Sequence, residues 1–311
     1  MNPLISIIVP VRNGEKTIGK CLDSLINLNY SNFEIIVIDD GSVDKTPEIL
    51  KKYNNIRILT TPGVGPSKAR NIAVQKSKGE FLAFTDADCL VDTNWLNELL
   101  KGFTNEKVAG VGGDQQSPED DTEFGKEVQN FFRTIGFVTG YIKSGKKTRE
   151  TNHNPSCNVM YRRDIFEKLK GFEERLWPGE DVELDYRIAK ANYRLMHNPK
   201  AVVYHYRPDT IAKLRRMMQN YGWSQGVITR KCGLFRVIQL EFPVLILILA
   251  FGIWLTYQNN FYGISFFVFL SLVPLFFFSA RGQKPFLFYK FFLLTMLSWN
   301  YGFLRGIIRG S

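Results

Sequence analysis

Cysteine is scarce in this 311-residue chain, and no two cysteines form a C-x-x-C pair. The cysteines Cys21, Cys89, Cys157 and Cys232 are far apart in the sequence, which argues against both a zinc cluster and a disulfide framework. The first residues also lack the basic leader and cleavage site of a signal peptide. We therefore expect no secretory leader and a globular part that faces a reducing cytosol.

Long apolar runs are absent before Phe242 but dominate the sequence after it. The runs Phe242–Tyr257, Tyr262–Ala280 and Phe286–Leu304 are close to the length of a membrane-spanning helix and have no polar face for water. Basic residues flank the first two runs, so the positive-inside rule predicts a hairpin with both ends in the cytoplasm. The third run either spans the membrane or lies in its interface, because spanning would carry Lys290 into the bilayer.

Acidic residues are outnumbered by basic ones, and the formal net charge is +10. Many basic residues are concentrated just before the apolar tail, namely Lys213, Arg215, Arg216, Arg230, Lys231 and Arg236. This position favours phospholipid headgroups as their partners, and no nucleic-acid-binding motif accompanies the charge. Arg215, Arg216, Tyr221 and Trp223 are interleaved as in an interfacial helix, whose aromatic rings lie at headgroup level. We place Gln219, Trp223, Arg215 and Arg216 on the membrane or acceptor side.

The part before the tail alternates short apolar strands with helical stretches. The expected strands are Leu4–Val9, Phe33–Asp39, Ile56–Thr60 and Glu80–Thr85, separated by helices around Gly14–Leu28, Thr46–Tyr53 and Pro66–Lys78. This order predicts an α/β domain with a mainly parallel sheet covered by helices on both faces. Ligands bind beyond the carboxyl ends of such strands, so Pro10–Asn13, Asp40–Asp44 and Asp86–Asp88 should converge on one pocket.

The middle of the chain has a weaker pattern. We expect helices at Trp95–Phe103, before Leu169 and at Glu180–Ala191, and strands at Val108–Gly113, Val159–Tyr161 and Ala201–Tyr206. Asp114–Asn154 is polar and predicted to be irregular, and its basic patch of Lys143, Lys146, Lys147 and Arg149 is either a solvated loop or a mobile gate. We assign residues 1–209 to this domain, 210–236 to amphipathic interfacial helices, and 237–311 to a transmembrane region of two or three helices.

The triplet Asp86-Ala87-Asp88 ends the strand EFLAFTDADC. Two carboxylates at a strand end can hold a hard divalent cation that also binds diphosphate oxygens, although an acidic turn without a ligand has the same pattern. A second motif, FEIIVIDDGSVD, supports the first, because Asp39 and Asp40 can accept hydrogen bonds from a base or ribose.

Two glycine-containing turns accompany these carboxylates. Gly41 and Ser42 permit a close approach of the backbone to a ligand. The segment GVGPSKARN, at Gly63–Asn71, opens a helix with Lys68 and Arg70 positioned to meet phosphate or a base carbonyl.

At these motifs the sequence resembles the inverting family-two nucleotide-sugar glycosyltransferases, which have the A-type fold. The matching residues are VPVRNGEKTIGKCLDSL at Val9–Leu25, VIDDGSVD at Val37–Asp44, SKARNIAVQKSKGEFLAFTDADC at Ser67–Cys89 and GEDVELDYRI at Gly179–Ile188. The motifs follow one another in the family's order and cover almost the whole part before the tail. The resemblance implies an A-type nucleotide-sugar-binding domain followed by a helical membrane region.

The resemblance, with the motifs above, assigns roles to single residues. The predicted nucleotide-sugar pocket contains Pro10, Val11, Asn13, Asp39, Asp40, Ser42, Lys68, Arg70, Asp86 and Ala87. Asp86, Asp88 and His205 are expected to hold Mn²⁺ or Mg²⁺, or else His205 is an ordinary histidine at a strand end. Asp181, with Glu180 beside it, is the expected catalytic base, the alternative being a carboxylate that the helix dipole favours.

The expected acceptor follows from a departure from the family pattern. Processive members carry Gln-x-x-Arg-Trp, whereas this chain has Gln219-Asn220-Tyr221-Gly222-Trp223, with glycine in place of arginine. We therefore predict transfer of a single sugar, from a UDP- or GDP-linked donor to a hydroxyl of a lipid-linked acceptor. The enzyme would be a multi-pass protein of the cell membrane with a cytoplasmic catalytic domain. The alternative is a polyprenyl-phosphate sugar synthase, in which the lipid phosphate is the nucleophile.

Two other classes of protein fit less well. Gly63 and Gly65 follow a strand as in a dinucleotide-binding oxidoreductase, but that fingerprint belongs after the first strand and needs a different glycine spacing. A nucleotide-sugar sensor without activity is the other alternative, and the presence of Asp86, Asp88 and Asp181 argues against it.

Overall fold

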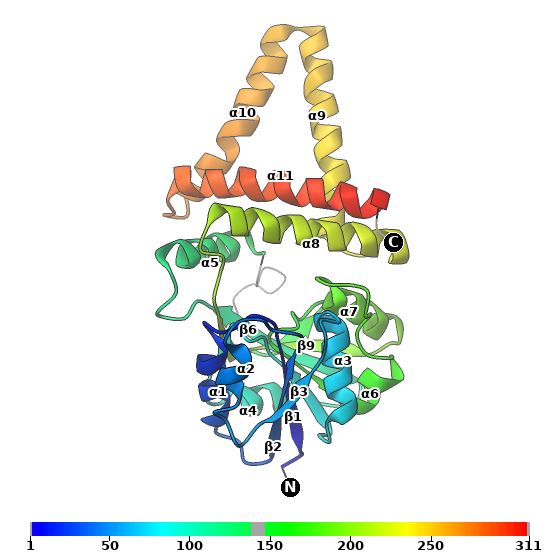
Figure 1. The fold of residues 1–311 in the computed structure, drawn as a ribbon. Coiled ribbons are helices and arrows are strands. Elements are labelled where there is room, and N and C mark those ends of the chain that lie inside the picture. The colour runs from blue at the N-terminus through cyan, green and yellow to red at the C-terminus, as the bar shows by residue number, and fades with distance from the viewer. Residues whose placement is uncertain (1, 138–146, 310–311) are drawn as a thin grey trace. The chain divides into compact units, whose positions relative to one another are not determined.

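The computed structural model describes residues 2–137 and 147–309. The chain forms two compact units, Met1–Arg207 and Pro208–Ser311 (Figure 1). Lys143 and Lys146 of the predicted basic patch lie outside the described residues, whereas Arg149 begins a short strand.

The first unit is built on a nine-stranded sheet. Its strands are β1 (Ile5–Val11), β2 (Phe33–Asp39), β3 (Arg57–Thr60), β4 (Phe81–Phe84), β5 (Cys89–Val91), β6 (Val108–Gln116), β7 (Arg149–Thr151), β8 (Val159–Arg162) and β9 (Arg194–His205). The order is β3-β2-β1-β4-β8-β6-β9-β5, and β7 pairs with β9. Strands β1 to β4 are mutually parallel and β8 is antiparallel to both of its neighbours, so the predicted α/β fold with a mainly parallel sheet is confirmed.

Helices cover the sheet on both faces, as the sequence predicts. The helices of this unit are α1 (Ile18–Ile26), α2 (Thr46–Leu50), α3 (Pro66–Lys76), α4 (Trp95–Leu100), α5 (Glu123–Ile135), α6 (Arg163–Lys168) and α7 (Glu180–Lys190), of which α5 lies away from the sheet faces (Figure 1). Successive side chains of a strand point to opposite faces, and every residue of β1 is buried. Ile7 packs in the core with α1 and α4, whereas Ile8 packs in the core with α3 and α7.

Several elements differ from the sequence-based expectation, among them the unpredicted strands β5 and β7 and a strand β6 that runs to Gln116. Helix α5 lies inside the segment that was predicted to be irregular, and that prediction is wrong there. The Thr122 hydroxyl caps the helix by accepting a hydrogen bond from the Gly125 N–H, and Gly136 ends it in the left-handed conformation. Strand β9 also begins at Arg194 rather than at Ala201, because its first half pairs with β6.

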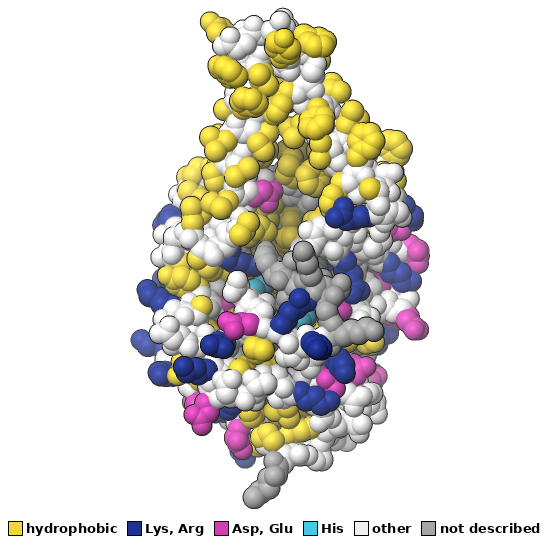
Figure 2. All heavy atoms as spheres, turned by 180° about the vertical axis from the view of Figure 1, so that it is seen from behind, with side chains coloured by type: hydrophobic (Ala, Val, Ile, Leu, Met, Phe, Trp, Pro, Cys, Tyr) yellow, Lys and Arg dark blue, Asp and Glu magenta, His cyan; other side chains and the backbone are white. Residues whose placement is uncertain are grey.

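The second unit is helical. It contains α8 (Ile211–Cys232), the short 3₁₀ helix η1 (Val237–Leu240), α9 (Glu241–Gln258), α10 (Asn260–Ser279) and α11 (Pro285–Arg309). Three helical segments, Val237–Gln258, Asn260–Ser279 and Pro285–Arg309, are long and apolar enough to cross a membrane. Helices α9 and α10 form a hairpin whose visible surface is covered by hydrophobic side chains, with Phe251 and Phe269 among the exposed ones (Figures 1 and 2).

Helix α11 packs along α8 through glycine (Figure 1). A Cβ atom on Gly222 of α8 would lie 2.0 Å from the carbonyl oxygen of Trp299, and one on Gly302 of α11 would lie 2.1 Å from that of Gln219. The two backbones therefore touch. Gly222, the residue that replaces the arginine of the processive signature, is needed here for close helix packing. In its apolar stretch 44% of α11 is buried, against 11% for each helix of the hairpin.

Candidate functional site

The loops that follow β1 and β2 are tied together at the carboxyl end of the sheet. The Asn13 N–H donates a hydrogen bond to the Ser42 Oγ (2.9 Å), and the Asn13 Oδ1 accepts one from the Val43 N–H (2.9 Å). Asn13 has φ 55°, a conformation that asparagine tolerates better than most residues. The Asp39 Oδ1 in turn accepts from the Ser42 N–H (3.0 Å). These predicted nucleotide-pocket residues therefore lie in one hydrogen-bonded cluster.

The third predicted segment joins this cluster through Ala87. A Cβ atom on Gly14 would lie 3.7 Å from the Cβ of Ala87, so the loop after β1 lies against the Asp86–Asp88 turn. Pro10 and Val11 are buried within β1, whereas Lys68 is exposed and forms an ion pair with Glu174 (3.5 Å). The structure brings the three predicted segments together at one edge of the sheet.

Asp40 has its hydrogen-bond partners inside the protein. Its Oδ1 accepts from the Thr61 hydroxyl and the Val64 N–H (both 2.6 Å), and its Oδ2 accepts from the Gly65 N–H (2.8 Å). Burial acts to raise the pKa of Asp40, but these hydrogen bonds outweigh it and lower the pKa below its usual value. The sequence suggested a ligand for this carboxylate, whereas the structure shows it holding the turn before α3.

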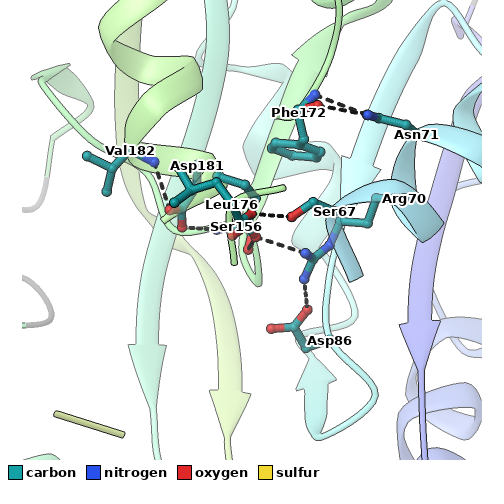
Figure 3. A network of polar contacts seen from close by, with 10 residues as sticks. Ser67, Arg70, Asn71, Asp86, Ser156, Phe172, Leu176, Asp181 and Val182 are labelled. Carbon is teal, nitrogen blue, oxygen red and sulfur yellow. Dashed lines mark hydrogen bonds and ion pairs between the residues drawn. The ribbon is translucent and has the colours of Figure 1, made fainter. Parts of the chain in front are cut away.

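Arg70 links the end of β4 to the start of α7 (Figure 3). Its Nη2 donates to the Asp86 Oδ1 (2.6 Å) and its Nη1 donates to the Glu180 Oε1 (2.8 Å). The side chain is 2% exposed, and its guanidinium bridges two carboxylates, whereas the sequence predicted that it would meet a phosphate or a base carbonyl. The bridge fixes Asp181, the neighbour of Glu180, close to the predicted donor-binding turn.

Glu180 and Asp181 have different surroundings. Glu180 is buried, and burial raises its pKa to about 7 despite the opposing effect of Arg70. Asp181 is partly exposed, and its Oδ2 accepts from the Ser156 N–H (3.0 Å) while its Oδ1 accepts from the Val182 N–H (2.7 Å). Of the two carboxylates, Asp181 is thus the one that a substrate can reach, and Glu180 is the one that Arg70 holds in place.

Asp88 and His205 face each other on neighbouring strands. The residue after Asp88, Cys89, pairs with His205 in the β5–β9 register. The Asp88 Oδ1 lies 3.3 Å from the His205 Nε2, and the two side chains are 48% and 16% exposed. Burial acts to lower the pKa of His205, but the Asp88 carboxylate raises it to about 10. A cation bound by both groups must therefore displace a proton from the imidazole.

The residues predicted for the acceptor side lie on α8 of the second unit. Arg215 and Arg216 are exposed, whereas Gln219 and Trp223 are partly buried where the glycines of α11 approach. Sequence reasoning missed Ser156, whose Oγ donates to the Glu180 Oε1 (3.1 Å) and whose N–H binds Asp181. The only signal for it was a short polar segment, HNPSCN, before a buried strand.

Comparison with known proteins defines the class. Residues 6–170 match the family described as glycosyl transferase family 2, and the chain belongs to that family. It is 26% identical to the dolichyl N-acetyl-alpha-D-glucosaminyl phosphate 3-beta-D-2,3-diacetamido-2,3-dideoxy-beta-D-glucuronosyltransferase of Methanococcus voltae, across 99% of this chain and 98% of that protein. It is 31% identical to the glycosyltransferase AglE of Haloferax volcanii, across 62% of this chain and 64% of that protein.

A solved structure shares the fold over the whole chain. The mannosyltransferase PcManGT from Pyrobaculum calidifontis, in complex with GDP-Man and Mn²⁺, matches with a TM-score of 0.70. The match covers 100% of this chain and 89% of that one, at 18% sequence identity. The likeness shows the A-type glycosyltransferase fold that the sequence predicted.

Proposed function

We propose that the protein is a membrane-anchored, inverting glycosyltransferase that moves one sugar from a nucleotide diphosphate to a hydroxyl of a lipid-linked acceptor. The observation that carries the proposal is the Arg70 bridge, because it holds the donor-side Asp86 and the helix that presents Asp181 in one fixed arrangement. The Methanococcus relative supports the acceptor class, since its name places the acceptor sugar on a dolichyl phosphate.

The donor would bind at the carboxyl end of β1, β2 and β4. The cluster of Asn13, Asp39 and Ser42 offers hydrogen-bonding groups for a base or ribose, and Asp86 lies next to it. The name of the mannosyltransferase with GDP-Man and Mn²⁺ supports a nucleotide sugar and a divalent cation as the bound pair. UDP- and GDP-linked donors both remain within the proposal.

Asp88 and His205 fit a divalent cation, because a carboxylate oxygen and an imidazole nitrogen lie 3.3 Å apart at a partly exposed position. Mn²⁺ or Mg²⁺ held there would neutralise charge on the departing diphosphate. Asp86 can add an oxygen of the carboxylate that Arg70 already orients. The protein would thus contribute two carboxylates, Asp86 and Asp88, and the imidazole of His205 to the binding of the cation and the donor.

Asp181 would take the acceptor proton. A sugar hydroxyl is a poor nucleophile until its proton is removed, and a partly exposed carboxylate within reach can remove it as the oxygen attacks the anomeric carbon. Backbone N–H groups of Ser156 and Val182 hold the two Asp181 oxygens, so the carboxylate is oriented before the acceptor arrives. Attack opposite the leaving diphosphate inverts the anomeric centre.

The second unit would anchor the enzyme. We infer that the α9–α10 hairpin spans the bilayer, and that α8 and α11 lie at the cytoplasmic interface as a packed pair. The half-buried α11 runs across the base of the hairpin, and exposed Arg215 and Arg216 on α8 suit anionic headgroups (Figure 1). This arrangement makes the protein multi-pass with a cytoplasmic catalytic domain.

Asp181→Asn tests the nucleophile. The change keeps the size of the side chain but removes its basicity, so turnover onto a lipid-linked sugar should fall by on the order of 10² or more with donor affinity nearly unchanged. Asp164→Asn, which removes an exposed carboxylate from the first turn of α6, is the control and should keep full turnover. Turnover is measured with a lipid-linked sugar in bilayers, and donor affinity by calorimetry.

The same experiment decides between the two acceptor classes. A lipid phosphate is already ionised near neutral pH and gains little from a base. Near-normal turnover by Asp181→Asn, together with glycosylation of polyprenyl phosphate itself, would replace the hydroxyl acceptor with the phosphate acceptor of a polyprenyl-phosphate sugar synthase.

A further inference from the structure

Two thiols and an imidazole lie close together next to the Asp88 carboxylate. The ligand atoms of Cys89, Cys157 and His205 all lie within 4.8 Å of one another. Cys89 and His205 are paired across β5 and β9, and Cys157 comes from the loop before β8. The sequence spacing had argued against a cysteine cluster, and strand pairing has brought these residues together.

The Asp88 carboxylate lies beside two members of this group. Its Oδ1 lies 3.3 Å from the His205 Nε2 and 3.8 Å from the Cys89 Sγ. In a tetrahedral zinc site with bonds of about 2.0 to 2.3 Å, neighbouring ligand atoms are roughly 3.3 to 3.8 Å apart. Both contacts of Asp88 already have this spacing, and the 4.8 Å limit on the distances among Cys89, Cys157 and His205 exceeds it by about 1 Å.

We propose that Cys89, Cys157, His205 and Asp88 form a site for a thiophilic divalent cation such as Zn²⁺. Two thiols favour zinc and cadmium over the oxygen-preferring Mn²⁺ and Mg²⁺. The thiols lose their protons when the metal binds, so two protons from the cysteines, and the one on the imidazole, pass to solvent. The ion can enter past Asp88, whose side chain is 48% exposed, whereas Cys89 and Cys157 are buried.

The site has a functional consequence that rests on the proposed function. Asp88 and His205 would serve both the donor-binding cation, which faces the diphosphate, and the thiophilic cation, which the cysteines hold. One pair of ligands cannot serve both ions, so binding of one excludes the other. Zn²⁺ would then act as an inhibitor that competes with Mn²⁺ and with the nucleotide sugar that needs it.

The experiment uses the full-length protein in detergent, stripped of metal, and Cd²⁺ as the probe. Cd²⁺ bound to thiolates gives a charge-transfer absorption band, which reports binding without any activity measurement. We expect one Cd²⁺ per chain, and a loss of at least about tenfold in affinity in Cys89→Ser and in Cys157→Ser. Cys232→Ser is the control, because Cys232 is a thiol at the end of α8 in the second unit, outside the cluster.

A second pair of variants is the control for loss of folding. Cys89→Ala and Cys157→Ala avoid a buried hydroxyl, and their melting temperatures and Mn²⁺-dependent donor binding show whether the domain is intact. A charge-transfer band that persists in the Cys89→Ala/Cys157→Ala double variant, or one that Cys232→Ser abolishes, overturns the site.

Competition between Mn²⁺ and the thiophilic cation for Asp88 and His205 is measured in a separate experiment. Adding Mn²⁺ should lower the apparent Cd²⁺ affinity in the wild-type protein, and Zn²⁺ should inhibit the wild type more strongly than the double variant. Cd²⁺ binding that Mn²⁺ does not affect overturns the sharing of Asp88 and His205. A protein that binds Cd²⁺ through both thiols yet transfers no sugar overturns the proposed function and leaves the thiophilic site standing.

Discussion

At the scale of single residues, Asp40 shows how a motif carboxylate can serve the fold. Its lowered pKa means that folding favours the ionised form. The stabilisation is therefore complete above the ordinary carboxyl pKa of about 3.9 and is lost as the pH falls through the lowered folded-state value. The contribution of the ionised Asp40 to the free energy of unfolding should be large at neutral pH and absent in strong acid.

Replacing this carboxylate tests that assignment. Asp40→Asn puts an amide donor against an N–H group in the turn before α3, so it should lower the free energy of unfolding by roughly 1 to 3 kcal/mol at neutral pH. The difference in free energy of unfolding between Asp40→Asn and the wild type should become smaller below about pH 4. Thermal unfolding followed by circular dichroism measures it. The control Asp164→Asn removes an exposed carboxylate and should cost less. A difference that does not change with pH would contradict the role given to the ionised Asp40.

The sequence predicts which carboxylates gather at the site better than it predicts what they bind. Asp86, Asp88 and Asp181 belong to local motifs with a recognisable spacing, so their gathering at one edge of the sheet is predictable. The burial of Arg70 between Asp86 and Glu180 is not, because it depends on contact between α3 and the start of α7. The Cys89–Cys157 pair likewise depends on strand order, which no local pattern contains.

At the scale of elements, the regular strands and helices follow from hydrophobic pattern. Strand β2 has the bounds that its apolar run predicts, and the apolar runs of the tail form α9, α10 and α11. Helix α5 was missed because its apolar residues are diluted by charged ones, although a threonine cap precedes it and a glycine ends it. Short strands such as β7 depend on their partner strand and have no pattern of their own.

The packing of α8 on α11 predicts that replacing a glycine by alanine lowers the melting temperature, the opposite of its usual effect in a helix. Alanine is a better helix former than glycine by about 0.8 to 1.0 kcal/mol, so Gly→Ala in a helix normally stabilises. Gly222→Ala should instead lower the melting temperature of the protein in detergent, because the new Cβ would meet the Trp299 carbonyl oxygen at 2.0 Å.

Gly19→Ala in α1 is the matched control for Gly222→Ala. Its Cβ would meet the Tyr53 hydroxyl at an ordinary 3.6 Å, so the melting temperature should stay the same or rise. Equal melting temperatures for Gly222→Ala and the wild type would mean that the two helices do not rely on glycine contact.

At the scale of the whole molecule, the chain divides into two compact units, and the proposed function gives each unit its own task. A chain ending at Arg207 should be soluble, should bind nucleotide sugar, and should transfer sugar to a water-soluble acceptor far better than to one embedded in a bilayer. A chain ending at Cys232 should be less soluble than one ending at Arg207, because it keeps α8 without α11 and exposes the face of α8 around Gly222 and Gly226. Donor binding is measured by the shift in melting temperature, and transfer by product formation. Equal transfer to the embedded acceptor by the shortened and full chains would contradict the anchoring role of the second unit.

The glycine contact between α8 and α11 also sets an order of assembly. The whole α9–α10 hairpin lies between these helices in the sequence, so α8 leaves the ribosome well before its partner has been made. Domains fold as units during synthesis, the N-terminal one first. The sheet domain can therefore be folded while the glycine-containing face of α8 is not yet covered by α11. Docking of α11 on α8 must therefore follow the synthesis of the whole hairpin. A defect in α11 would leave a folded sheet domain attached to an exposed α8 that quality-control proteases can reach.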